Sequence, residues 1–318
     1  MTSLSGSFRQ NFIRMSPPAK LILLVFMVLV FALFGSLLAM LIAMPLYGYD
    51  FVELSGIVTN PDSENIGVIK FFQIFQSITL FIIPSLIAAW LFSTNAAGYL
   101  QSNRKFSWLT VLMVMLSIIS AIPFLNKITE LNMQMDLPEQ FNRLEEYMKS
   151  MEESAARLTE LFLKSDSTTD LMVNFVMIAI LPAIGEELLF RGVVQRLFTD
   201  WTRNQHVGVI LSAFLFSFIH FQFYGFIPRL LLGLFFGYLL LWSGSIWVPI
   251  IGHLINNGLA VLYYHFAKGP VGETTMDTIG TGSGNYLIYL SVFVTSLLIG
   301  MIYLHEKSNR ESAEGNFI

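Results

Sequence analysis

The chain has 318 residues, of which 54% are hydrophobic and only 13% are charged. Its mean hydropathy of +0.64 lies well above the range of soluble globular domains. A net charge of −4 is too small to indicate a nucleic acid or another polyanion as a partner. The absence of cysteine excludes disulfides, thiolate nucleophiles and cysteine-ligated metal sites. The composition therefore predicts a membrane protein that crosses the bilayer several times.

Eight apolar runs predict transmembrane helices of about 17 residues or more, the sixth being marginally short. They cover residues 21–46, 68–92, 108–124, 171 into the Glu186-Glu187 pair, 207–223, 227–241, 246–266 and 286–304. The first run is too long for the apolar core of a cleaved signal peptide, so we expect it to be retained. Pro84 should kink the second helix and Pro123 should help to end the third.

Basic residues indicate how the chain is oriented in its membrane. They flank the same ends of the predicted spans, at Arg9, Arg14, Lys20, Arg104, Lys105, Arg196, Arg203, Lys307 and Arg310. The positive-inside rule makes this side cytoplasmic, with both termini, in a cell (plasma or inner) membrane. The first loop on the other side carries only acidic charges, Asp50, Glu53, Asp62 and Glu64.

The long loop 127–170 contains apolar residues in steps of three and four, which predict an amphipathic helix. Its narrow apolar seam is formed by Leu137, Phe141, Leu144, Met148, Met151, Ala155, Leu158 and Phe162, after a helix start at Asp136 and Pro138. Such a helix either lies on the membrane or packs over the span bundle, or it dimerises as a coiled coil. Its position would also suit a lid or a substrate-screening element.

These segments predict an all-α polytopic helix bundle of about eight transmembrane helices with one extramembrane amphipathic helix. We divide the chain into a cytoplasmic segment 1–20, N-terminal spans 21–126, the helical loop 127–170, a core 171–304 and a cytoplasmic tail 305–318. The polar sequence from Ser308 onward favours disorder. Lys70 is expected to extend its amine toward the membrane surface. Arg229 is expected to contact lipid headgroups, with a site carboxylate or the carboxyl terminus of a substrate as the alternative partners.

Three polar insertions interrupt the apolar second half. The first holds Glu186, Glu187 and Arg191, where an ionisable side chain facing lipid would cost on the order of 3 kcal/mol. On a helix Glu187 and Arg191 are four residues apart and can form an ion pair, which leaves Glu186 the freer carboxylate. The other insertions are His220 and the pair His253 and Asn257. Together they offer a base, a proton carrier and oxyanion donors, the groups that water activation requires.

The order Glu186-Glu187-x-x-x-Arg191, Phe216-x-x-x-His220 and His253-x-x-x-Asn257 on successive spans resembles the three motifs of the CPBP family. This family comprises intramembrane proteases related to the type II CAAX prenyl endopeptidase and to bacterial immunity-type (Abi) membrane proteins. The resemblance covers residues 171–266 and implies peptide hydrolysis inside the bilayer, on membrane-associated or lipidated protein substrates.

The resemblance also implies a role for each matched position. Glu186 and His220 would hold and deprotonate the attacking water, and His253 and Asn257 would stabilise the tetrahedral oxyanion. Glu187 and Arg191 would form the supporting ion pair. One divalent metal, zinc, held by Glu186, His220 and His253, and a metal-free glutamate mechanism both stay open. Other cofactors and nucleic acid are not expected.

Two other functions compete with the protease. Eight spans with buried charges can line the path of a secondary transporter, although the intramembrane polar residues here cluster in the second half and form no repeat. A non-catalytic bacteriocin-immunity or scaffold protein on the same fold is the other alternative. It would keep its function when Glu186 and His220 are replaced by alanine.

Overall fold

The computed structural model describes residues 4–135, 138–163, 167–267, 275–282 and 286–315. Within these ranges the regular elements are all helical, which confirms the all-α fold. The α-helices are α1 Leu4–Arg14, α2 Pro17–Tyr47, α3 Phe51–Thr59, α4 Ile66–Ser77, α5 Ile83–Phe92, α6 Ala96–Tyr99, α7 Trp108–Met133, α8 Asn142–Leu163, α9 Thr168–Asn174, α10 Leu181–Glu186, α11 Gln195–Thr202, α12 Gln205–Phe218, α13 Phe226–Ser243, α14 Trp247–Ala267, α15 Thr275–Thr278 and α16 Leu287–Gly315. Three π-helical segments and one 3₁₀ turn complete them: η1 Ile78–Ile82, η2 Glu139–Phe141, η3 Phe175–Ile180 and η4 Glu187–Val194.

The chain is a multi-pass membrane protein. In the described part, six helices are long and apolar enough to cross a bilayer: Pro17–Tyr47, Ile66–Phe92, Trp108–Met133, Thr168–Thr202, Phe226–Ser243 and Leu287–Ser312. The other two predicted spans are present as helices but are not among these six. They are α12, which has only 14 residues, and α14, which has 21 and carries His253, Asn256 and Asn257. The fifth run ends as a helix at Phe218, not at 223, because Phe221 adopts a positive φ of 52°.

Prolines shape two of the long spans. Pro84 and Pro182 each follow a π-helical segment that ends two residues earlier, η1 and η3. Proline has no N–H for the carbonyl four residues before it, and a wider π turn accommodates that missing bond. Pro123 behaves differently from the prediction, because α7 continues past it to Met133. The helix turn at Pro123 is stabilised by α16, where the Ser291 hydroxyl accepts a hydrogen bond from the backbone N–H of Phe124.

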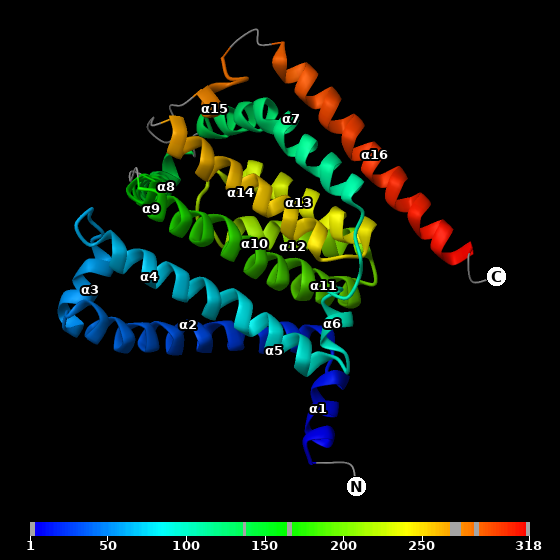
Figure 1. Cartoon of the computed structure of the whole chain (residues 1–318), viewed down its shortest axis with the longest axis horizontal. Coiled ribbons are helices and arrows are strands. Elements are labelled where there is room, and N and C mark those ends of the chain that lie inside the picture. The colour runs from blue at the N-terminus through cyan, green and yellow to red at the C-terminus, as the bar shows by residue number, and fades with distance from the viewer. Residues whose placement is uncertain (1–3, 136–137, 164–166, 268–274, 283–285, 316–318) are drawn as a thin grey trace.

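The helices form a bundle around the segment α9 to α11 (Figure 1). The pair α2 and α4–α5 lies on one side of this segment, and α12, α13 and α14 lie on the other. Helix α7 packs along α16 beyond them. Leucine and phenylalanine side chains on α2 and α16 are largely exposed, as expected for helices that face lipid.

The amphipathic loop helix is confirmed as α8, which begins at Asn142 after the turn η2. The predicted start at Asp136 and the seam residue Leu137 lie outside the described residues. Helix α8 packs over the bundle, where Phe162 is buried against Ile69 and Met177. This agrees with the packed alternative, while dimerisation stays a prediction.

Two peripheral segments differ from the expectation. The Lys70 side chain is buried and pairs with Asp170 at 2.7 Å, so its amine is held by the protein and joins the second and fourth spans. The tail is not irregular from Ser308, since α16 continues as a helix to Gly315. A Lys307–Glu311 pair one turn apart, at 3.9 Å, lies in this extension.

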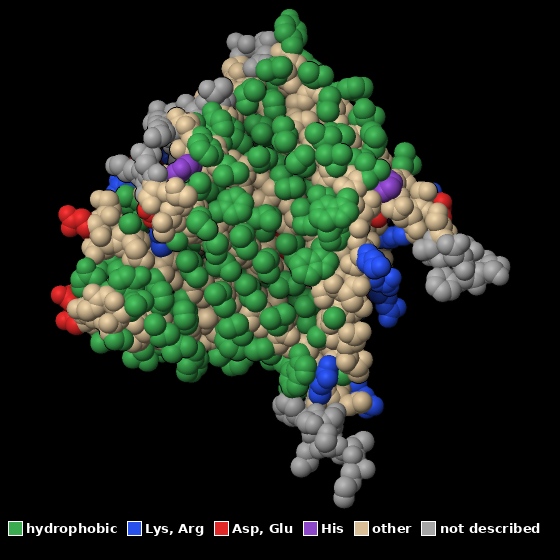
Figure 2. Space-filling model, viewed as in Figure 1, with side chains coloured by type: hydrophobic (Ala, Val, Ile, Leu, Met, Phe, Trp, Pro, Cys, Tyr) green, Lys and Arg blue, Asp and Glu red, His purple; other side chains and the backbone are tan. Residues whose placement is uncertain are grey.

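Charge separates the two ends of the bundle. Lysine and arginine side chains gather on the right in Figure 2, near α1 and the ends of α11 and α16, and acidic side chains mark the left edge. We call the end that carries Arg9, Arg104, Lys105, Arg196, Arg203 and Arg310 the basic end, and the end that carries α3 and α8 the opposite end.

Candidate active site

The two adjacent glutamates lie where the central segment changes from α10 to the π-helical η4. π turns inside α-helices occur often at functional sites, because they alter the direction of the side chains that follow. Here they give the two carboxylates different surroundings. The Glu187 side chain is 0% exposed, whereas that of Glu186 is 12% exposed and borders a cavity. The expectation that Glu186 is the freer carboxylate is confirmed.

Glu187 is the centre of a buried charged network. Its Oε1 accepts hydrogen bonds from Arg191 Nη1 at 2.8 Å and from His253 Nδ1 at 2.9 Å. Arg191 Nη2 also donates to the carbonyl of Gly233 on α13, at 3.0 Å. The predicted ion pair is therefore present, but Glu187 does more than pair with arginine: it binds a histidine 66 residues away and fixes the orientation of that ring.

Two phenylalanines pack around this network and exclude water from it. The guanidinium of Arg191 lies 4.5 Å from the ring centre of Phe216 and 5.6 Å from that of Phe236. Phe236 also stacks on His253, with ring centres 5.2 Å apart and an interplanar angle of 17°. Phe216 contacts His220 edge to face at 5.1 Å. Phe216 of the second motif thus contacts both Arg191 of the first motif and His220 of its own motif.

His253 connects the two glutamates. Because its Nδ1 bonds to Glu187, its Nε2 is the atom left to face Glu186 Oε2, at 4.0 Å. That separation is too long for a direct hydrogen bond. A carboxylate and an imidazole at this distance can share a proton through a water or hold one reacting group between them.

His220 follows the last turn of α12, where its Nδ1 bonds to the Phe216 carbonyl at 2.7 Å. A carbonyl only accepts, so Nδ1 carries the proton and the neutral ring keeps a free lone pair on Nε2. His220 also borders the cavity that Glu186 borders. In this tautomer His220 accepts a hydrogen bond at Nε2 rather than donating one.

Asn257 is held on the far side of the cavity by backbone and side-chain bonds. Its Nδ2 donates to the carbonyl of Ile178 at 3.0 Å, and its Oδ1 accepts from Asn256 Nδ2 at 3.1 Å. Ile178 lies four residues before Pro182, which has no N–H to give that carbonyl. The second N–H of the Asn257 amide is left for another acceptor.

A cavity of about 560 Å³ brings the predicted residues together. Glu186, His220, His253 and Asn257 all line it, while Glu187 and Arg191 support it from behind. The remaining lining comes from α4, α8, the π-helical η3, Pro182 of α10, Phe216 of α12, α13 as far as Phe236, and α14. The size is typical of a ligand or substrate site.

Further residues complete the cavity wall. Arg229 lines it, with Nη2 donating to Gln222 and Nη1 buried, which favours its expected alternative role at the site over a contact with lipid headgroups. Asn256 lines it beside Asn257. Thr159 of α8 does so too, although it belongs to a loop far from the motifs in sequence. The only sequence signal for Arg229 was a cation at the start of a span.

The zinc alternative needs Glu186, His220 and His253 around one ion. In the described residues no group of three or more His, Asp or Glu side chains is placed to hold a metal. Nδ1 of both histidines is bonded within the protein, to the Phe216 carbonyl and to Glu187, which leaves Nε2 of each ring as the atom that could bind an ion. Zinc held by Glu186, His220 and His253 therefore stays a prediction, beside the metal-free mechanism.

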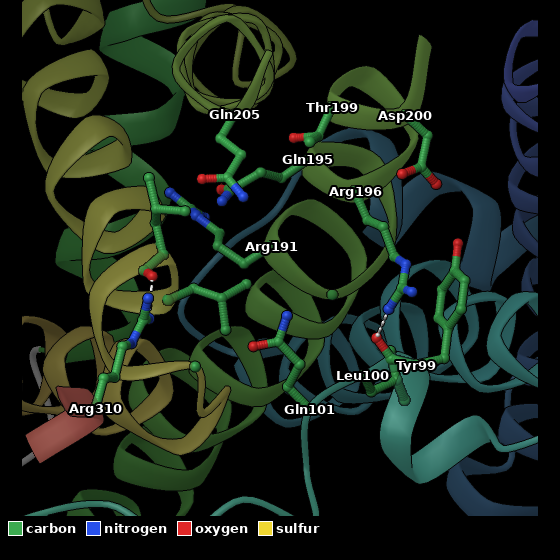
Figure 3. A pocket seen from close by; sticks show the side chains of 14 residues that line it. Tyr99, Leu100, Gln101, Arg191, Gln195, Arg196, Thr199, Asp200, Gln205 and Arg310 are labelled. Carbon is green, nitrogen blue, oxygen red and sulfur yellow. Dashed lines mark hydrogen bonds between the residues drawn. The ribbon is translucent and has the colours of Figure 1, made fainter. Parts of the chain in front are cut away.

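A second pocket, of about 340 Å³, lies on the basic side of Arg191 (Figure 3). Figure 3 shows Arg196 pointing to the backbone of Tyr99, with Gln195, Gln205 and Arg310 on the surrounding walls. No residue that lines this pocket also lines the cavity of Glu186. Because it contains neither histidine nor a motif glutamate, it is not the predicted catalytic site.

Residues 168–259 match the family model described as type II CAAX prenyl endopeptidase Rce1-like. The chain thus contains a domain of this CAAX and CPBP protease family, and the resemblance carried by the three motifs is confirmed. The match begins at α9 and ends within α14, so it contains the site residues named above. Comparisons with curated proteins and with solved structures gave no match.

Proposed function

We propose that this chain is an intramembrane endopeptidase of a cell (plasma or inner) membrane, with both termini in the cytoplasm. The observation that carries the proposal is the approach of Glu186 to His253, at 4.0 Å, on a cavity inside a bundle of membrane-spanning helices. The family match covers this convergence and gives the class of reaction. The substrate class is a peptide bond in a membrane-associated or lipidated protein.

Water activation falls to the two groups that accept hydrogen bonds. Glu186 takes one proton of the attacking water, and the free Nε2 of His220 accepts a hydrogen bond from the O–H that remains, which orients the lone pair of the oxygen. The hydroxide attacks the scissile carbonyl carbon and forms a tetrahedral intermediate. Glu186 then gives its proton to the leaving amine, so that the carboxylate is restored at the end of the cycle.

Stabilisation of the oxyanion falls to His253 and Asn257. Held by Glu187 through Nδ1, a protonated His253 directs its Nε2–H into the cavity. The second N–H of the Asn257 amide is directed there as well, because the first is bonded to Ile178. Donors fixed in this way, away from bulk water, are worth much more than the same donors in solution.

Glu187 and Arg191 act as positioning residues. Arg191 compensates the charge of Glu187, which leaves that carboxylate able to hold His253 without itself entering the reaction. This division explains why two consecutive glutamates are present. One is fully buried and fixed, and the other borders the cavity.

The test compares the ends of membrane proteins in cells that express the wild type or Glu186→Gln. Peptide ends that depend on Glu186 support the proposal and identify substrates. The matched control is Glu153→Gln, which changes an exposed carboxylate of α8 and should leave the same ends as the wild type. If both variants give the wild-type ends while the chain is folded and in the membrane, Glu186 is not the base of a protease. Uptake that depends on Glu186 without cleavage would point to the transporter instead.

A further inference from the structure

The cavity of Glu186 is closed toward one end of the bundle and lined by terminal segments at the other. Its lining includes Gly225, Pro228 and Arg229, which stand at or near the start of α13. It also includes Gln73 of α4 and four residues of α8: Ala155, Leu158, Thr159 and Phe162. Helix α8 and the start of α4 lie at the opposite end, near α3 (Figure 1), and α13 starts there because α12 before it runs from α11 at the basic end. None of the lining residues is one of the lysines or arginines that define the basic end.

Depth along the helices gives the same direction. Glu186 is about 27 Å from the start of the span Thr168–Thr202 and about 24 Å from its end, at 1.5 Å per residue. The carboxylate is therefore close to the middle of the span. Arg229 lies only about 5 Å from the start of α13 by the same measure. The cavity thus extends from mid-span to the boundary at the opposite end.

Toward the basic end the cavity is blocked by packed side chains. Glu187, Arg191 and Phe236 are each at most 1% exposed. Behind them Val193, Leu197 and Ile246 belong to a hydrophobic core cluster and are equally buried. The pocket on that side reaches Arg191 but shares no lining residue with the cavity. A peptide arriving from the basic end would have to displace this packing.

We infer that substrate enters from the extracytoplasmic side, next to α8, and that an outer juxtamembrane segment inserts into the cavity as far as Glu186, where it is cleaved. The inference rests on the proposed function and adds to it the substrate class: outer juxtamembrane segments of membrane-anchored proteins. The basic end is cytoplasmic by the positive-inside rule, so the opposite end faces outward. Lipidated carboxyl termini on the cytoplasmic face would meet the closed end of the cavity.

The lining also defines what such a segment should contain. Leu158, Phe162, Met177 and Leu232 offer apolar contacts, and Thr159, Asn256 and Gln73 add neutral polar groups. The cationic Arg229 shares the wall with them, bonded to Gln222. This surface suits apolar or neutral residues on both sides of the scissile bond and disfavours lysine and arginine.

The absence of cysteine permits a clean test of access. Single variants Thr159→Cys and Gln73→Cys report on the cavity, and Gln205→Cys, exposed at the basic end, is the matched control. A membrane-impermeant maleimide is applied to sealed right-side-out and inside-out vesicles. We expect Thr159→Cys and Gln73→Cys to react in right-side-out vesicles and Gln205→Cys in inside-out vesicles. Reaction of Gln73→Cys from the cytoplasmic side, or from neither side, overturns the inference.

Mapping the Glu186-dependent peptide ends separates this inference from the proposed function. Ends in outer juxtamembrane segments support both. Ends in cytoplasmic segments leave the protease in place and overturn the direction of entry. If no end depends on Glu186, the proposed function fails, while the labelling pattern still decides whether the cavity opens outward.

Discussion

The two pockets on either side of Arg191 differ in how their charged groups are held. In the basic-end pocket Arg196 is exposed, bonds to the Tyr99 carbonyl and lies 4.3 Å from the centre of the Tyr99 ring, and Asp200 beside it is exposed. On the cavity side Glu187, Arg191 and His253 are buried and bonded to one another. The charged side chains at the basic end are therefore solvated and replaceable, whereas those beside the cavity are fixed by other protein groups.

The largest effect is expected from Glu186, the one motif carboxylate that borders the cavity. Glu186→Gln keeps the shape of the side chain but removes the base, so kcat should fall by about 10²- to 10⁴-fold with unchanged folded yield. Glu187→Gln should instead lower the yield of folded protein, because a buried arginine loses its counter-charge. Cleavage of an identified substrate and detergent size-exclusion profiles measure the two effects. Equal activity of the wild type and Glu186→Gln would show that Glu186 is not the catalytic base.

Arg191 and Arg196 offer a direct contrast between the two pockets. Arg191→Met leaves Glu187 buried without its ion pair and should lower the free energy of unfolding by about 3–5 kcal/mol. Arg196→Met removes one part-buried hydrogen bond and the contact with the Tyr99 ring, and should cost only about 1–2.5 kcal/mol. Unfolding in mixed detergent micelles measures both. Similar losses for the two variants would show that burial does not distinguish the pockets.

Asn257 and Asn256 provide a smaller contrast within the cavity. Asn257→Ala removes a proposed oxyanion donor and should lower kcat by about 10²- to 10³-fold with little change in KM. Asn256→Ala removes only the bond to Asn257 Oδ1, and its effect should stay within about 10-fold. Steady-state kinetics of the two variants measure the difference. A loss that falls mainly on KM would assign Asn257 to substrate binding.

The sequence predicted what depends on local pattern. Apolar runs gave the spans, and four-residue spacing gave the Glu187–Arg191 pair. The three motifs identified residues that do line one cavity or support it. The roles of Glu186, His220, His253 and Asn257 in the reaction stay predictions.

The sequence did not predict features that depend on contacts between distant segments. The bond from His253 to Glu187 spans 66 residues, so no local spacing indicates it. For Arg229 the sequence left both lipid headgroups and the site open, since nothing in its own segment shows that Gln222 bonds it at the cavity wall. Helix α12 ends early because Phe221 adopts a positive φ, and α7 continues past Pro123 with support from Ser291 of α16. Local preference predicts neither feature.

The smallest expected effect concerns Glu152, which lies on α8 over the cavity wall. Burial raises the pKa of Glu152 above its usual value, and the nearby Arg229 offsets part of that shift. A carboxyl whose pKa is raised on folding binds its proton more tightly in the folded state, so the packing of α8 is firmest at acidic pH. This contribution is lost as pH rises from the ordinary glutamate pKa through the raised one. Hydrogen-exchange protection of the α8 amides, corrected for the intrinsic exchange rate, should therefore decrease over that interval in the wild type and stay level in Glu152→Gln. If Glu152→Gln shows the same decrease, another group causes the loss of protection. The charged groups held by the protein beside the cavity would then be Glu187, Arg191 and His253, without Glu152.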